Sequence, residues 1–290
     1  MKNLVKKGLL FGLFLLLFSF IVNYLYYRVV VATDWDMGKR IESINFVDPD
    51  YELLVLGSSL AQYGVDTELL TSKGIKAYNM GMVGSSVKTG FIQLKEYIEN
   101  YNINPKYVIL AVNATIETFD PTGIHPVVEF TMKDQEYDYS DIPVSKFRWQ
   151  GHELFKKAFS KEYRSGVVSY GQVKRTKVVP DNSDYKEELL DLDEYKSADW
   201  IKEIAVLCDK NNIELFVVEI PTVNEYQNLS DVGPYKIKYS EGCTVNLYNF
   251  NSREFCSFIN QSEDWVGLSH FNAKGAAKFT QELVRTIPLD

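Results

Sequence analysis

The sequence has 290 residues, enough for one large α/β domain in addition to an anchoring segment. The formal net charge is −8 at pH 7; the first 28 residues carry four basic and no acidic side chains, which leaves a net charge of −12 on the remainder. Such an acidic surface repels polyanions, so we expect no nucleic acid partner.

The first element in the chain is an uncharged apolar segment from Gly8 to Tyr27, preceded by Lys2, Lys6 and Lys7. A helix of about 20 residues spans a bilayer core of about 30 Å, and positive flanking charge favours the cytoplasmic side. We therefore predict a single-pass anchor in the cell membrane, with the N-terminus cytoplasmic and the main domain extracytoplasmic. The alternative is a cleaved signal peptide, but bulky residues follow the segment and no clear small-x-small cleavage site is present.

The chain divides into three predicted parts: 1–28 as cytoplasmic stub and anchor, 29–50 as a juxtamembrane segment, and 51–290 as the main domain. Within the main domain, a stretch at about 116–195 is acidic and aromatic and breaks the rhythm of strands and helices. We interpret it as an insertion over the carboxyl edge of the sheet, either a wall of the site or a surface excursion.

The main domain alternates strand and helix patterns. Short apolar runs without polar alternation are typical of strands buried on both faces of a parallel sheet, and they occur at 52–57, 107–112 and 213–220. Weaker strand patterns at 244–248 and 75–78 are two further candidates. Helical patterns lie at 86–100, 197–211 and 273–286. This order predicts a three-layer α/β/α sandwich with about five parallel strands and a site at their carboxyl ends.

Ser59 and His270 are the candidate catalytic residues. Ser59 follows the first core strand in Gly57-Ser58-Ser59, where a sharp turn into a helix can expose a nucleophile near free backbone N–H groups. A serine here is more commonly a helix cap. His270 lies in a loop before the last helix, from which its imidazole could take the serine proton and return it to a leaving group.

Two further residues are candidate donors to an oxyanion, together with the backbone N–H of Ser59. Gly84 opens a helix after a short strand and could present an unobstructed N–H group. Asn113 ends the strand 107–112, where its side-chain amide could donate a second hydrogen bond. The alternatives are a turn glycine, and a strand-end cap or glycosylation sequon at Asn113.

The order of these residues resembles the SGNH/GDSL hydrolase superfamily, whose four blocks supply Ser, Gly, Asn and His. Gly57-Ser58-Ser59-Leu60 resembles its Gly-Asp-Ser-Leu block, and Asn79-x-Gly81-x-x-Gly84 its second block. Asn113 is similar to the third, and His270-Phe271-Asn272-x-x-Gly275-Ala276 to the fourth. The resemblance implies a flavodoxin-like sandwich and ester chemistry through a serine nucleophile.

The Gly-Ser-Ser form and the anchor make the chain similar to SGNH proteins of D-alanyl-lipoteichoic acid synthesis and polysaccharide O-acetylation. This implies an esterase or O-acyltransferase acting on an acylated cell-surface polysaccharide or teichoic-acid-like polymer, beside a membrane-bound O-acyltransferase. A catalytically weak or inactive SGNH domain that binds glycan or scaffolds that acyltransferase is the alternative. No metal or dissociable organic cofactor is expected.

The sequence departs from the family at the acid that usually precedes the histidine by three residues, because this position is Gly267. Asp264 is the preferred substitute and Glu263 a second candidate. A Ser59–His270 dyad without an acid is the other active arrangement. Neutralising the acid of such a triad costs about 10⁴ in kcat in another hydrolase fold, so the departure matters.

The three cysteines form no metal-binding pattern. Cys208 lies in an apolar helical run and is expected to fill the core. Export permits a disulfide between Cys243 and Cys256, but spacing alone does not establish it.

Overall fold

The structure, a computed structural model, describes residues 2–33, 50–101, 103–113, 166–178, 186–188, 191–222, 225–227, 232–240, 242–251, 257–260, 262–267 and 269–289. Helix α1 (Lys2–Thr33) belongs to one compact unit, and all the other described elements belong to a second, α/β unit. The predicted juxtamembrane segment beyond Thr33 and most of the predicted insertion lie outside the described residues.

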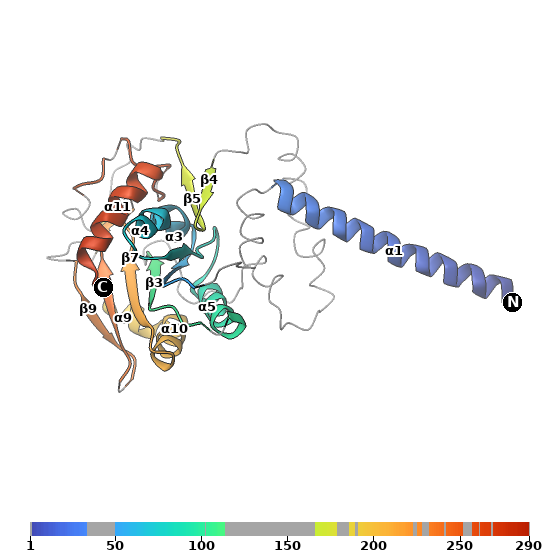
Figure 1. Ribbon diagram of the computed structural model, residues 1–290, viewed down its shortest axis with the longest axis horizontal. Helices are drawn as coiled ribbons and strands as arrows, with labels where there is room; N and C mark the ends of the chain where they lie inside the picture. The colour runs from blue at the N-terminus through green and yellow to red at the C-terminus, as the bar shows by residue number, and fades with distance from the viewer. Residues whose placement is uncertain are drawn as a thin grey trace. The chain divides into compact units, whose positions relative to one another are not determined.

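Helix α1 is drawn in blue in Figure 1. Its part Lys2–Val22 is long and apolar enough to cross a membrane, with a mean hydropathy of 2.1. Large apolar side chains such as Leu9, Leu16 and Phe20 are 71–75% exposed, so no protein core covers them. A helix satisfies its own backbone hydrogen bonds, which is the condition for spanning lipid. The structure thus has one N-terminal helix long and apolar enough to span a membrane, and this helix continues five residues beyond the predicted end at residue 28.

The α/β unit is built on a six-stranded sheet in the order β2–β1–β3–β7–β10–β9. Its five parallel strands are β1 (Leu53–Gly57), β2 (Ala77–Asn79), β3 (Tyr107–Val112), β7 (Glu214–Glu219) and β10 (Thr244–Asn249). These match the predicted strands. The register places Leu54 of β1 between Tyr78 of β2 and Val108 of β3.

Strand β9 (Tyr235–Lys238) was not predicted. It pairs antiparallel with β10 at the edge of the sheet. Ile237 is buried while Lys236 and Lys238 are exposed, an alternation typical of an edge strand with one face in solvent. A run of four residues with one buried apolar side chain gives too weak a pattern to be recognised in the sequence.

Helices cover both faces of the sheet (Figure 1). On one face lie α3 (Ser59–Gly64), α4 (Thr67–Ser72) and α11 (Ala273–Thr286), and on the other α5 (Val87–Tyr101), α9 (Leu192–Ser197) and α10 (Asp199–Lys210). Strand side chains alternate between the two layers: Val55 packs in the cluster of Phe279, and Leu54 in that of Ile204. The predicted three-layer α/β/α fold is confirmed.

Described parts of the predicted insertion form small elements of their own. β4 (Gly166–Ser169) and β5 (Gln172–Arg175) make an antiparallel hairpin, and β6 (Lys186–Glu188) pairs in parallel with β8 (Glu225–Gln227). Helix α9 begins at Leu192, and Tyr195 is fully buried in the core. The last residues assigned to the insertion thus belong to a layer of the sandwich.

Candidate active site

The turn after β1 depends on a glycine. Gly57 has a φ of +138°, and a Cβ there would lie 2.3 Å from the carbonyl oxygen of Ala111, so no larger residue fits without moving β3. Ser58 caps α3, because its Oγ accepts a hydrogen bond from the N–H of Leu60 at 3.3 Å. Ser59 is the first residue of α3 and is half-buried. The turn places its hydroxyl at the carboxyl end of β1.

His270 is held by a short loop that precedes α11. Trp265 and Phe271 form an antiparallel bridge, and the N–H of Val266 donates to the carbonyl oxygen of His270 at 2.8 Å. Both aromatic rings are buried, with centroids 4.4 Å apart, which fixes the loop to the core. Asn272 then caps α11 by accepting hydrogen bonds from two N–H groups of its first turn.

The structure brings the two predicted catalytic residues together. Nε2 of His270 lies 2.7 Å from Oγ of Ser59. When the serine donates this hydrogen bond, Nδ1 carries the ring proton, and Nδ1 lies 3.3 Å from Oγ of Ser269, which can accept it. In this tautomer the imidazole can take the serine proton as the oxygen attacks a substrate.

The environment of His270 keeps its imidazole neutral. Burial, and secondarily the positive charge of Arg175, lower the pKa of His270 to about 4. A neutral ring at pH 7 is the form that a general base needs. A carboxylate beside the ring would raise this pKa, and within the described part of the chain none does so.

Asp264 does not orient His270 in the structure, which corrects the preferred prediction. Its side chain is fully buried, and its Oδ2 accepts hydrogen bonds from the N–H of Asn260 at 2.6 Å and from Nζ of Lys278 at 2.5 Å. No described contact joins this carboxylate to the imidazole. Asp264 instead fixes the turn that starts at Asn260 to α11, which carries Lys278. The second candidate, Glu263, lies at the surface, 3.9 Å from Nζ of Lys274.

Gly84 lies in the loop between β2 and α5, and this loop is hydrogen-bonded to the turn after β1. The N–H of Met82 and Oγ of Ser85 both donate to the carbonyl oxygen of Gly57, at 3.1 and 3.3 Å. Gly84 is exposed, has a φ of +72°, and has open space where a Cβ would stand. Its N–H makes no hydrogen bond to any described residue, as a donor to a substrate oxygen requires.

Asn113 has a structural contact at the edge of the sheet. It is fully buried after the end of β3, and its Nδ2 donates to the carbonyl oxygen of Ile220 at 2.8 Å. This bond joins the carboxyl ends of β3 and β7. Its role in the structure is to fix the edge of the sheet, and donation to an oxyanion stays a prediction.

Asn79 and Gly81 have a role that sequence matching alone did not reveal. Nδ2 of Asn79 donates to the carbonyl oxygens of Ala61 and Val65 at 2.7 and 3.1 Å. Its Oδ1 accepts from the N–H of Gly81 at 3.0 Å, and a Cβ at Gly81 would lie 2.6 Å from Cβ of Ala61. The Asn-x-Gly pair therefore holds α3, the helix that starts with Ser59, against β2.

Two neighbours of His270 were not predicted. Tyr63 packs its ring edge-on against the imidazole, with centroids 5.2 Å apart and an interplanar angle of 87°. Arg175 of β5 stacks on the same tyrosine, with Cζ 4.1 Å from the ring centroid. Tyr63 is four residues from Ser59, a spacing that puts two side chains on one helix face and could have identified it. Arg175 lies in the irregular stretch, where the sequence gives no such signal.

No group of three or more His, Cys, Asp or Glu side chains within the described ranges is placed to hold a metal ion. Cys208 is buried in the core, and burial raises the pKa of its thiol to about 12, in agreement with its predicted core-filling role. Cys243 is also buried, and neither forms a disulfide with a described residue. Cys256, the partner considered for Cys243, lies outside the described residues.

Comparisons with known proteins add little to this geometry. No family model and no curated protein matches the chain. One solved structure, from Streptococcus pneumonia and provisionally described as a platelet activating factor, aligns over 91% of this chain and 97% of its own. The identity is 11% and the TM-score 0.36. This likeness is too distant to assign a family or an activity.

Proposed function

We propose that the protein is an extracytoplasmic serine acyl-ester hydrolase or O-acyltransferase of the SGNH/GDSL type. The observation that carries the proposal is the 2.7 Å distance between Oγ of Ser59 and Nε2 of His270. The exposed N–H of Gly84, in a loop bonded to the turn that carries Ser59, supports it. The pKa of His270, lowered to about 4, leaves the imidazole neutral at pH 7 but makes it a weaker base than an ordinary histidine.

The chemistry proceeds in two balanced halves. Oγ of Ser59 attacks the acyl carbon while its proton moves to Nε2 of His270, and the ester oxygen leaves with that proton as an alcohol. The acyl group is then attached to Ser59. Water or a sugar hydroxyl attacks next, gives its proton to the imidazole, and takes the acyl group, after which the proton returns to Ser59. Backbone N–H groups of Ser59 and Gly84, and the amide of Asn113, are the proposed donors to the oxyanion.

The substrate we propose is an acylated cell-surface glycan or teichoic-acid-like polymer. Helix α1 supports a membrane location, and the three lysines before its apolar part favour a cytoplasmic N-terminus. The α/β unit then works outside the cytoplasm beside a membrane-bound O-acyltransferase, which would supply or receive the acyl group.

A second candidate function is favoured by one observation: among the described residues no carboxylate contacts His270. A protein whose dyad lacks its acid can serve as a glycan-binding or scaffold partner of the acyltransferase without turning over an ester. The Ser59–His270 hydrogen bond would then be a remnant of the active arrangement.

Labelling of the purified full-length chain with a serine-directed fluorophosphonate separates the two functions. We expect one adduct, mapped to Ser59 by mass spectrometry, and loss of labelling in Ser59→Ala and His270→Ala. Ser58→Ala is the matched control, because it removes the neighbouring hydroxyl that only caps α3. A wild-type chain that acquires no adduct at Ser59 would contradict the enzymatic function and leave the scaffold function.

The acceptor decides between hydrolase and transferase. Incubation of the labelling-competent chain with an acetyl ester, with and without a soluble oligosaccharide, distinguishes them. A hydrolase releases acetate at the same rate in both cases, whereas a transferase yields acetylated sugar at the expense of acetate.

A further inference from the structure

Arg175 is a cation with unused hydrogen-bonding capacity close to the proposed catalytic pair. Its Nη2 donates to the hydroxyl of Tyr63 at 2.6 Å, and its Cζ lies 4.1 Å from the centroid of that ring. A guanidinium has five N–H donors, and within the described part of the chain no carboxylate pairs with this one. We propose that Arg175, stacked on Tyr63, binds an anionic group, a phosphate or a carboxylate, that the substrate carries next to its acyl ester.

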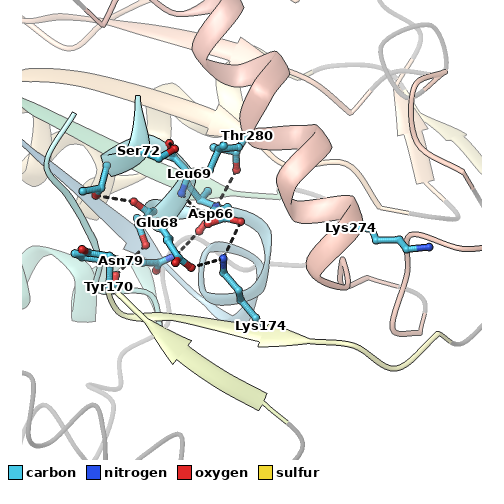
Figure 2. A network of polar contacts seen from close by, with 12 residues as sticks. Asp66, Glu68, Leu69, Ser72, Asn79, Tyr170, Lys174, Lys274 and Thr280 are labelled. Carbon is cyan, nitrogen blue, oxygen red and sulfur yellow. Dashed lines mark hydrogen bonds and ion pairs between the residues drawn. The ribbon is translucent and has the colours of Figure 1, made fainter. Parts of the chain in front are cut away.

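Lys174, the adjacent cation on the same strand, differs from Arg175 in being paired with carboxylates. Figure 2 shows Lys174 reaching from β5 to Asp66 and Glu68, with distances of 3.2 and 2.6 Å from its Nζ. The hydrogen bond from Lys174 also lowers the pKa of Glu68. Lys174 is thus neutralised by two carboxylates and has a structural role in docking the hairpin. Arg175, one residue further, has an aromatic platform in place of an acid.

The hairpin that carries Arg175 is held in a defined position. The carbonyl oxygen of Tyr170, at its tip, accepts hydrogen bonds from the N–H of Asn79 and from Oγ1 of Thr67, both at 2.9 Å. Gly171 has a φ of +80°, and a Cβ there would lie 2.1 Å from the carbonyl oxygen of Asn79. Only glycine allows this approach, so the hairpin is fixed against β2 and α4 (Figure 2).

Tyr63 links Arg175 to the reacting groups. One ring contacts both the guanidinium, at 4.1 Å, and the imidazole of His270, at 5.2 Å. The charge of Arg175 reaches His270, whose pKa it helps to lower. The ring contact and the hydrogen bond to Tyr63 hold the guanidinium before substrate binds, which reduces the ordering cost of a two-point bond to a phosphate or carboxylate. The position and the donor geometry both suit an anion adjoining the ester.

The inference rests on the proposed function, so its test compares the hydrolysis of anionic and neutral esters by the same variant. The quantity measured is the ratio of their kcat/KM values. The full-length chain in detergent is assayed with 4-acetoxybenzoate, 4-acetoxyphenyl phosphate and the neutral methyl 4-acetoxybenzoate, all at one pH. In Arg175→Gln we expect the kcat/KM ratio of each anionic ester to the neutral ester to fall about 10- to 100-fold, mainly through KM, since charged hydrogen bonds are lost. Lys177→Gln is the matched control, because it removes an exposed cation of the same segment without breaking the ion pairs of Lys174 that dock the hairpin, and its ratio should equal that of the wild type.

The outcomes distinguish the inference from the function on which it rests. If Arg175→Gln keeps the wild-type ratio while hydrolysing all three esters, the proposal of an anion subsite is wrong. The proposed esterase activity is then retained. If no ester is hydrolysed and Ser59 takes no fluorophosphonate, the proposed function fails, and the subsite with it. If Arg175→Gln does not fold, Arg175→Lys replaces it, and its ratio must fall, though less, because the charge remains without the planar fork. A larger fall for the phosphate ester indicates a phosphodiester polymer, and a larger fall for the carboxylate a uronate-type glycan.

Discussion

Oγ of Ser59 and Nε2 of His270 lie 2.7 Å apart although 211 residues separate them in the chain. The elements that follow them are also joined, because the N–H of Asp66, the N-cap of α4, donates to Oγ1 of Thr280 in α11 at 2.8 Å (Figure 2). The pair therefore depends on the packing of α3, α4 and α11 on one face of the sheet.

The lowered pKa of His270 predicts an unusual acid limit for activity. The folded-state pKa is about 4 against an ordinary value of 6.5, so the imidazole stays neutral as the pH falls through 6.5 and becomes protonated only near 4. We expect kcat/KM for a neutral ester to be constant from about pH 5 to pH 8 and to fall about tenfold per unit below the pKa. A pH profile measures this, and an acid limb centred at 6.5 would contradict it.

Replacing Gly267 by aspartate should supply the missing acid. Gly267 has a φ of +84° but open space around a Cβ, so an aspartate is strained without being excluded. We expect fluorophosphonate labelling of Ser59 in Gly267→Asp to accelerate on the order of 10-fold, with a stability loss of about 1 kcal/mol. Gly267→Asn is the matched control, with the same strain and no charge. Equal rates in the two variants would show that position 267 does not reach the imidazole.

Asp264 should matter for stability and not for catalysis. In Asp264→Ala the N–H of Asn260 loses its acceptor and Lys278 its partner, so we expect the free energy of unfolding to fall by about 1–3 kcal/mol. The labelling rate of the folded protein should stay at the wild-type value. Glu263→Ala removes a neighbouring exposed carboxylate and should cost less than about 0.5 kcal/mol. Urea unfolding and labelling together measure both quantities; a slowed labelling at unchanged stability would restore Asp264 as the orienting acid.

The two glycines of the site should tolerate alanine very differently. In Gly57→Ala the new Cβ would lie 2.3 Å from the carbonyl oxygen of Ala111, at a φ of +138°. We expect a loss of about 3 kcal/mol or more in the free energy of unfolding. In Gly84→Ala the new Cβ has no atom within 4 Å, so only the positive φ destabilises the variant. We expect its free energy of unfolding to fall by about 1 kcal/mol. Thermal unfolding of the two variants compares them, and similar midpoints would show that the turn after β1 can relax.

Charges introduced into α1 should release the protein from membranes without unfolding it. Leu13 and Leu16 are 54% and 71% exposed, so no protein packing depends on them. Each lysine at the centre of a membrane helix costs about 2.5–3.5 kcal/mol. We expect the wild-type chain to resist alkaline carbonate extraction and the Leu13→Lys/Leu16→Lys double variant to be extracted. N-terminal sequencing of the membrane-bound chain checks for cleavage, because a signal peptide would be missing from it.

Much of the fold was predictable because its parallel strands are buried on both faces. Leu53–Gly57 and Tyr107–Val112 are apolar throughout and buried throughout, so the sequence pattern and the environment agree. The helix at Ala273–Thr286 was predicted with the bounds that the structure shows, since Asn272 caps it and Pro288 follows it closely. Strand β9 was not predicted because its four residues bury only one apolar side chain.

The site was predictable where it depends on local turns and not where it depends on distant contacts. Ser59 and His270 lie next to residues whose local roles can be recognised in the sequence, namely helix caps and a turn glycine. The structure shows these residues in those roles. The partners of Asp264 and the stacking of Arg175 on Tyr63 arise from packing between segments far apart in sequence. No local pattern records that Asp264 meets Lys278, so its assignment to the histidine followed only from distance along the chain.

The separation of the serine and the histidine along the chain has a consequence for biosynthesis. A growing polypeptide that has reached α3 contains the alcohol but not its base, and the hydroxyl of Ser59 is then no more reactive than any other. On the proposed function, the hydroxyl of Ser59 becomes reactive only after the loop before α11 has been synthesised and has docked on the sheet. On that function, truncated products that end before residue 270 therefore lack the base and cannot form an acyl ester at Ser59.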